Sequence, residues 1–348
     1  MDAILSTQRR RLLLGLGGSA ALTLAGCGRP STRAEVHFTG ETMGTTYNVK
    51  VARWSQGGRL SDLQEAVHAT FDGVNRRMSL YSTDSELARF NRSSGDVTFS
   101  EDLWRVVAAG QEVAAATDGA FDMTVAPLVV RWGFGPAPRG SVPQGEEIRT
   151  IRARTGHQAL QLDGGRRLAS KRRADLELDL GGIAKGYGVD LAASALDAAG
   201  AEHYMVEAGG EVRTRGVNAD GQPWRIGVEQ PDAMPQRARL VVPLSGRAMA
   251  TSGDYRNYFE ADGRRYSHEI DPRTGAPIDH RLCSVTVVAE DCMRADALAT
   301  ALLVLGPERG VRMAESLGLA AYFIERVAPA RHVDRQTGAF AALGGHAA

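Results

Sequence analysis

The stretch between Tyr204 and Glu290 sets the narrowest limits on the fold of this chain. Five short segments rich in apolar and β-branched residues follow one another there: "YMVEA", "WRIGVE", "RLVVPL", "AMATSG" and "SVTVVAE". Turns that contain glycine, aspartate or proline separate these segments, which is typical of strands joined in antiparallel meanders. This half of the chain therefore predicts an antiparallel sheet.

Helices are expected on both sides of these strands. In residues 61–81, Ser61 and Gln64 have the spacing of a capping box. Ser100 is expected to cap a second helix. The apolar residues of the first helix recur at intervals of three and four, as one buried face requires: Leu63, Val67, Phe71, Val74 and Met78.

Three further helices complete the pattern. One runs from Ile183 to Ala199 and is stopped by Gly200. Another, "CMRADALATALLVLG", ends at Gly306-Pro307, and "GVRMAESLG" then leads into the apolar strand "LAAYFIE". Runs of strands with intervening helices, without strict βαβ alternation, predict an α+β fold with mixed, largely antiparallel sheets and packed helices.

The charge balance limits the classes of partner. The 41 basic and 41 acidic residues cancel, so nothing in the net charge indicates a nucleic-acid groove, and we expect no nucleic-acid partner. Residues 136–145 are rich in proline, glycine and arginine, and we expect them to form an exposed loop between lobes. Residues 331–348 are expected to be a loose C-terminal tail.

The N-terminus predicts export. Three arginines, Arg9 to Arg11, precede the apolar run "LLLGLGGSAALTLAG", which ends at Cys27 and is short for a membrane span. "LAGC" resembles a lipoprotein signal, with cleavage before Cys27 and lipid on its thiol. The arginines loosely resemble a twin-arginine signal, so both Sec and Tat export fit. We expect a signal peptide at 1–26 and a tether at 27–35.

Two cysteines belong to the mature domain. Cys283 opens an expected strand and Cys292 an expected helix. In an oxidising compartment they form either a disulfide or two buried free thiols, and the sequence leaves both open. Their spacing is not that of a metal site.

Five segments are unusually polar and glycine-rich for packing positions: "MSLYSTDSELARFN", "TDGAFDMTVAPLVVRWGFGP", "LDLGGIAKGYGVD", "EAGGEVRTRGVNADGQPWRIGVEQP" and "ATSGDYRNYFEADGRRYSHEIDPRTG". Each alone fits loop glycines, helix caps and surface ion pairs. The "TMGTTY" stretch near the first expected strand likewise fits either a plain turn or a wall shaped for a ligand. Together, the segments favour a ligand site.

These segments resemble the blocks of a known family. "TMGTTYNV", "GAFDMTVAPLVVRWGFGP", "DLGGIAKGYGVD", "ATSGDYRNYF", "SHEIDPRTG" and "DCMRADALATALLVLG" occur in the order found in the ApbE family of FAD:protein FMN transferases, from about His37 to Phe323. The resemblance implies a T-fold-like, two-lobed transferase domain at 36–330. It also implies a lipid-anchored protein of the inner membrane that faces the periplasm.

A magnesium site is expected near the start of the helix that contains Asp296. Asp296 and Thr300 are four residues apart, so their oxygens project from one helix face. A carboxylate and a hydroxyl, together with a backbone carbonyl, suit a hard divalent cation that keeps several waters. The resemblance implies Mg²⁺ at this site and assigns the carbonyl to Gly182.

A flavin nucleotide site is expected beside the metal. "DLGGIAKGYG" places glycines before a helix that carries Lys185, so backbone N–H groups and a cation can face phosphate. The resemblance implies that Asp179 and Lys185 contact the nucleotide. It implies the same role for Met43, Tyr81, Ala120, Phe121, Asp122 and Ile270. On this interpretation the Met-Gly-Thr-Thr stretch is a pocket wall, with Met43 as a soft apolar contact.

The general base stays open between two residues. His268 in "YSHEIDPRTG" can take a hydroxyl proton near neutral pH, although a lone strand histidine is often structural. A carboxylate such as Asp296 is the alternative.

The expected function is Mg²⁺-dependent transfer of the FMN half of FAD to a threonine or serine hydroxyl of an exported or membrane flavoprotein, with release of AMP. FAD is then a consumed substrate. The alternatives are an FAD-binding storage or electron-transfer lipoprotein, and an FAD pyrophosphatase that uses water as acceptor.

Overall fold

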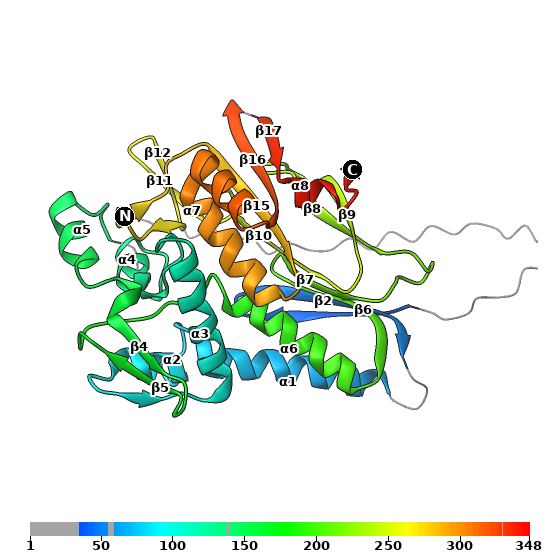
Figure 1. Ribbon diagram of the computed structural model, residues 1–348, viewed down its shortest axis with the longest axis horizontal. Coiled ribbons are helices and arrows are strands. Elements are labelled where there is room, and N and C mark those ends of the chain that lie inside the picture. Colours follow the sequence, from blue (N-terminus) through cyan, green and yellow to red (C-terminus); the bar gives the residue numbers. More distant parts are fainter. Residues whose placement is uncertain (1–34, 55–58, 138–139, 329) are drawn as a thin grey trace, which may run out of the picture. The chain divides into compact units, whose positions relative to one another are not determined.

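A large antiparallel sheet forms the middle layer of the computed structural model, which describes residues 35–54, 59–137, 140–328 and 330–348 (Figure 1). The expected signal peptide, Cys27 and nearly all of the tether lie outside these residues. The sheet has eight strands in the order β1-β2-β6-β7-β10-β15-β16-β17. Their bounds are Val36–Thr42, Thr45–Trp54, Ala201–Ala208, Glu211–Arg215, Ala248–Gly253, Leu282–Ala289, Ala320–Ala328 and Arg331–Gln336.

Helices cover one face of this sheet and a small sheet covers the other. The helices α1 (Leu60–Met78), α6 (Ala184–Ala198) and α7 (Cys292–Ser316) pack on the first face, where they bury two apolar clusters. The small sheet has the order β18-β9-β8 and buries a third cluster against the second face. The α+β class with largely antiparallel sheets is therefore confirmed.

The strands of the small sheet and the other elements complete the fold. They are α2 (Glu86–Arg92), β3 (Val97–Thr98), α3 (Glu101–Ala116), η1 (Met123–Val125), α4 (Ala126–Arg131), α5 (Gly145–Arg152), η2 (His157–Ala159), β4 (Leu160–Asp163), β5 (Leu168–Lys171), β8 (Trp224–Glu229), β9 (Ala238–Leu244), β11 (Tyr258–Ala261), β12 (Arg264–Ser267), β13 (Ile270–Asp271), β14 (Ala276–Pro277), α8 (Gly338–Ala341) and β18 (His346–Ala347). Within the described ranges, no helix has the length and apolar character of a membrane span.

The start of α1 differs from the prediction. The helix begins at Leu60, one residue earlier than expected, with Arg59 as its N-cap. The carboxylate of Asp62, rather than the side chain of Gln64, accepts a hydrogen bond from the Arg59 backbone N–H at 3.2 Å. A charged acceptor in the first turn also complements the helix dipole, so it competes well against a neutral Ser61–Gln64 pair.

The C-terminal residues are not a loose tail, so that prediction was wrong. Strand β17 pairs with β16 along the edge of the large sheet, and β18 pairs with β9. Phe340 of α8 is buried and stacks on Tyr322 with ring centroids 5.2 Å apart. The polar sequence of β17 concealed this order, because an exposed edge strand needs no alternating apolar pattern.

The other helix and strand predictions agree with the structure. Ser100 accepts a hydrogen bond from the backbone of Leu103 at the start of α3. Gly306 has φ 80° and interrupts the helical geometry of α7, as the Gly-Pro pair predicts. Cys283 and Cys292 are buried free thiols, which decides between the two alternatives for this pair.

Candidate active site

One cavity of about 990 Å³ collects residues from all five glycine-rich segments. It opens between the helices and the strand ends, and segments that are far apart in the sequence meet at its walls. Apart from Cys27, every predicted site residue lines it: Met43, Tyr81, Ala120, Phe121, Asp122, Asp179, Gly182, Lys185, His268, Ile270, Asp296 and Thr300. The structure thus brings these residues together, while their individual roles remain predictions.

The Met-Gly-Thr-Thr stretch is both a turn and a wall. Met43 and Gly44 are the two loop residues of the β1–β2 hairpin, with φ values of 47° and 74°. Positive φ at both positions is what a tight two-residue hairpin turn requires, and a bulky residue rarely adopts it. Met43 lines the cavity at this turn, so the strained position places its side chain beside the ligand space.

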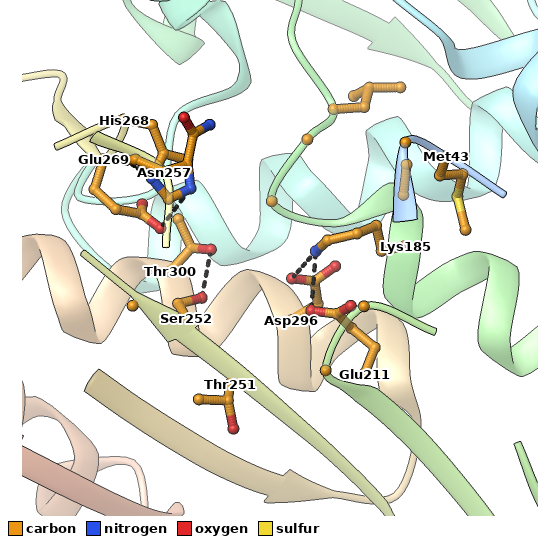
Figure 2. A pocket seen from close by; sticks show the side chains of 18 of the residues that line it. Met43, Lys185, Glu211, Thr251, Ser252, Asn257, His268, Glu269, Asp296 and Thr300 are labelled. Carbon is orange, nitrogen blue, oxygen red and sulfur yellow. Dashed lines mark hydrogen bonds and ion pairs between the residues drawn. The ribbon is translucent and has the colours of Figure 1, made fainter. Parts of the chain in front are cut away.

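A buried charge cluster lies on one wall (Figure 2). We call Lys185, Glu211 and Asp296 the Lys185 cluster. The Lys185 ammonium donates to Glu211 Oε1 at 2.9 Å and lies 3.6 Å from Asp296 Oδ1. The other oxygen, Asp296 Oδ2, accepts from the backbone N–H of Gly186 at 3.0 Å. One cation therefore faces two carboxylates that are 1% and 2% exposed.

The electrostatics of this cluster follow from its burial. Burial raises the pKa of Glu211 to about 8, and the neighbouring charge of Asp296 adds to the effect. Burial also raises the pKa of Asp296, although Lys185 opposes this. Burial alone would lower the pKa of Lys185, but the two carboxylates outweigh it and raise that pKa. Two acids thus face one ammonium, and burial opposes the ionisation of both.

The predicted metal ligands lie next to this cluster. Thr300 Oγ1 shares a hydrogen bond of 3.0 Å with Ser252 Oγ, one helical turn beyond Asp296. A Cβ on Gly182 would lie 3.0 Å from Thr300 Oγ1 and 3.3 Å from the Phe121 ring, so only glycine brings its backbone this close. In the part of the chain that the structure describes, no group of three or more acidic, histidine or cysteine side chains forms a metal centre.

This donor set fits Mg²⁺. It combines one carboxylate, from Asp296, with the neutral oxygens of Thr300 and Gly182, and it borders a cavity with room for waters and phosphate. Mg²⁺ prefers hard oxygen donors and keeps several waters, whereas a zinc site would need nitrogen or sulfur ligands. Such an ion would favour the ionised form of both buried acids, which together carry one more charge than Lys185 neutralises.

Two predicted nucleotide contacts have other partners. The carboxylate of Asp122 accepts from the Thr124 backbone at 2.8 Å and from the His157 backbone at 2.9 Å, so it organises the start of η1. The ammonium of Lys185 is neutralised within its cluster and is a weaker phosphate ligand than the sequence suggests. Both residues still line the cavity.

Asp179 and Tyr81 both line the cavity, and Tyr81 lies at its exposed rim. Asp179 Oδ1 accepts from the backbone N–H of Gly181 at 2.7 Å, and burial raises the pKa of Asp179. Tyr81 is 71% exposed, and its hydroxyl donates to the carbonyl of Phe134 at 3.1 Å. An aromatic ring this exposed at the rim is a natural surface on which a planar ring system stacks.

His268 is held in one orientation. Its Nδ1 lies 3.0 Å from the carbonyl oxygen of Asn257, so Nδ1 bears the proton in the neutral ring. The free Nε2 then has a lone pair and lies 3.6 Å from the carboxylate of Glu269. An imidazole fixed through one nitrogen by a carbonyl, with the other nitrogen available, has the geometry of a general base.

Among the cavity residues that the sequence did not single out are Glu211, Ser252 and Glu269. Glu211 follows Gly209-Gly210, two glycines with positive φ, at the start of a buried strand. An acidic residue at the start of a buried strand needs a cation as partner, and this was the sequence signal that could have identified Glu211. Glu269 is the sequence neighbour of His268, and burial raises the pKa of its carboxyl group.

Comparison with known proteins identifies the family. The ApbE family profile matches residues 43–323 of the chain. The chain belongs to the ApbE family. The FAD:protein FMN transferase of Vibrio cholerae is 46% identical over 301 residues, covering 86% of this chain and 89% of the relative. The enzyme of the same name from Escherichia coli K12 is 38% identical over 319 residues, covering 88% and 91%.

Solved ApbE structures have the same fold. Flavin transferase ApbE from Vibrio cholerae superposes with a TM-score of 0.81 at 43% identity, covering 89% of this chain and 99% of that one. The apo form of the flavinyl transferase ApbE from Pseudomonas stutzeri gives 0.81 at 45% identity, covering 89% and 96%. The family prediction is therefore confirmed by sequence and by fold.

Proposed function

We infer that this chain is an FAD:protein FMN transferase. Membership of the ApbE family carries this conclusion, because relatives with that name match the chain over most of its length. The cavity supports it: the Lys185 cluster and the Gly182 backbone suit a metal-bound diphosphate, and the exposed Tyr81 ring suits a planar group.

The proposed step is a phosphoryl-type transfer. The oxygen of an acceptor threonine or serine attacks the phosphorus of the FMN half of FAD, and the bond from that phosphorus to the bridging oxygen breaks. The acceptor gains FMN through a phosphodiester, and AMP leaves with the bridging oxygen. The hydroxyl proton passes to a base, for which we propose His268 Nε2 because Nδ1 is held by Asn257.

Mg²⁺, held by Asp296, Thr300 and the Gly182 carbonyl, would neutralise the diphosphate and the phosphate that leaves. The chain's own residues prepare that place. Gly186 and Lys185 fix the two oxygens of Asp296, and Ser252 fixes the hydroxyl of Thr300. Asp179 lies in the same loop as Gly182, before α6, where its carboxylate is oriented by the backbone N–H of Gly181.

We also propose that the enzyme acts at a membrane surface outside the cytoplasm. The support is the "LAGC" sequence that ends at Cys27, behind an arginine-containing apolar run. Lipid on Cys27 would confine the enzyme to exported or membrane flavoproteins. Replacement of Cys27 by alanine should release the folded enzyme into the soluble envelope fraction; a protein still bound to membranes after washing would contradict the anchor.

Mass spectrometry of both products tests the function. Purified protein is incubated with FAD, Mg²⁺ and the cell-envelope proteins of the parent organism. We expect an acceptor threonine or serine to gain the mass of FMN less water, with one AMP released per transfer. FMN and AMP with unmodified acceptors would indicate a pyrophosphatase. Unconsumed FAD would indicate a binding protein.

A further inference from the structure

Strand β8 has one unpaired edge, and this edge borders the cavity. In the three-stranded sheet β18-β9-β8, only β9 pairs with β8. Arg225, Ile226 and Gly227 line the cavity in succession. Successive side chains of a strand point to opposite faces, so a cavity that meets all three residues touches the edge of the strand and not one face.

The register shows which backbone groups point away from β9. The carbonyl of Arg239 accepts from the backbone N–H of Ala348 at 3.3 Å, so odd-numbered residues of β9 direct their backbone groups toward β18. The even-numbered residues Val242 and Leu244 then bond to their partners in β8, Ile226 and Trp224.

Consequently the N–H and C=O groups of Arg225 and Gly227 point away from the sheet. Pro243 opposite Arg225 agrees with this, because proline has no N–H to give to β8. Within the described residues, these four groups have no backbone hydrogen-bond partner. Gly227 also has no side chain, so another backbone can approach it closely.

The end of β8 connects this edge to the proposed base. The hydroxyl of Tyr255 donates to Glu229 Oε2 at 3.1 Å, and Arg256 also binds that oxygen. The next residue along the chain, Asn257, holds Nδ1 of His268 through its carbonyl. A chain lying along β8 is thereby led toward the side of the cavity where His268 lies.

We propose that the acceptor protein docks as an extended segment that adds a strand to the free edge of β8. This inference rests on the proposed function, which requires a protein hydroxyl to enter the cavity. Backbone hydrogen bonds to Arg225 and Gly227 would hold the segment largely independently of its sequence. The two-residue repeat of a strand would then direct the acceptor threonine or serine toward the cavity.

The first test uses peptides as acceptors. A pool of synthetic peptides of about nine residues, enough to exceed β8 at both ends, has one central threonine and randomised flanks. It is incubated with the enzyme, FAD and Mg²⁺, and flavinylated peptides are sequenced. The best peptide is then N-methylated at one backbone position at a time. We expect transfer to fall at every second position and to persist at the positions between them.

The second test removes one hydrogen-bond donor from the edge. Gly227→Pro and Gly227→Ala both add a Cβ, which would lie 3.2 Å from the Cβ of Ala238, but only proline removes the N–H. We expect the KM for the peptide to be roughly 10-fold higher in the proline variant than in the alanine variant, as for one or two lost hydrogen bonds. The melting temperature and the FAD affinity of both variants report whether they fold.

Each outcome decides the proposal. Sensitivity to N-methylation without a two-residue period, or equal KM values for the two variants, would overturn strand addition while the transferase function stands. Flavinylated envelope proteins without any flavinylated peptide would also overturn it, because an extended segment alone would not be recognised. A dimer that Gly227→Pro converts to a monomer would assign the edge to a second copy. If neither proteins nor peptides are flavinylated, the proposed function itself fails.

Discussion

The Lys185 cluster and a second cluster around Arg326 each place a cation between two carboxylates, yet the carboxylates differ in how fully they are bound. In the second, the Arg326 cluster, Arg326 donates to both oxygens of Asp254 at 3.1 Å and to Asp232 at 2.8 Å, and Arg265 lies 3.6 Å from Asp232. In the Lys185 cluster the ammonium makes one short bond, and the buried Glu211 Oε2 has no hydrogen-bond partner within the described residues.

The difference follows from the two cations. A guanidinium has a planar fork of donors that matches carboxylates, whereas an ammonium is a compact point charge. Burial alone would raise the pKa of Asp232, but the hydrogen bond and charge of Arg326, together with Arg265 and His332, outweigh it and lower that pKa. In the Lys185 cluster burial prevails and raises the pKa of both acids. The Arg326 cluster is therefore closed, whereas the Lys185 cluster holds two buried acids whose ionisation another cation would favour.

Replacement of Asp296 should give the largest effect. Asp296→Asn removes the charge of the proposed metal ligand with little change in shape, so transfer should fall at least roughly 10³-fold, as expected when several kcal/mol of charge stabilisation are lost. In EDTA the variant should melt no lower than the wild type, because burial disfavours the ionised carboxylate of Asp296 when no metal is bound. Transfer rates and melting curves on one preparation check both parts.

Asp254→Asn is the matched control in the Arg326 cluster. It breaks a buried pair whose oxygens are both bound, so the free energy of unfolding should fall by about 2–3 kcal/mol. The transfer rate at a temperature where it is folded should equal that of the wild type. If the two variants lost activity to the same extent, the contrast between the clusters would be wrong.

His268→Ala should have the next largest effect. If Nε2 takes the acceptor proton, the rate should fall roughly 10²-fold or more, while FAD affinity is retained. Loss of FAD affinity and thermal stability together, with normal turnover at saturation, would make His268 a structural residue and return the role of base to a carboxylate.

Thr300→Val should have a moderate effect on the metal alone. A neutral hydroxyl is a weaker ligand than a carboxylate, so the Mg²⁺ concentration for half-maximal rate should rise about 5- to 10-fold, the worth of one such interaction. Thr300→Ser keeps the oxygen and should restore the wild-type value. An equal rise in both variants would indicate a packing effect at this position.

The smallest expected effect concerns stability and pH. The pKa of Glu211 is raised to about 8, so in EDTA the folded protein binds a proton that the unfolded chain has lost. Stability should therefore decrease as the pH rises from 6 to about 8, by about 2 kcal/mol. In Glu211→Gln, which cannot titrate at this position, the free energy of unfolding from denaturant curves should change less with pH over this range. An unchanged slope would show that Glu211 is already ionised at neutral pH.

Much of the fold followed from local signals. The strand segments from Tyr204 onward, the cap at Ser100 and the break at Gly306 each depend on a few adjacent residues, which sequence displays directly. The predictions that failed concern an edge strand and the first turn of a helix. β17 is polar because it is exposed, and α1 starts with a carboxylate that satisfies its own N-cap.

The site was predictable as a set of segments but not as a network. The family blocks marked Asp296 and Lys185, whereas the pairing of Lys185 with Glu211 joins residues 26 positions apart and needs the sheet to bring them together. The free edge of β8 likewise could not be predicted from the sequence. It depends on which strands pair with β8 in the folded sheet and not on the residues of β8 alone.

A thermal titration with Mg²⁺ tests the central claim, that the Lys185 cluster is open to a further cation and the Arg326 cluster is closed. Wild type, Asp296→Asn and Asp254→Asn are saturated with FAD and melted over a series of Mg²⁺ concentrations. We predict that Mg²⁺ raises the melting temperature of the wild type and of Asp254→Asn, whose starting value is lower, and leaves that of Asp296→Asn unchanged. A Mg²⁺-dependent rise in Asp296→Asn equal to that of the wild type would contradict the account.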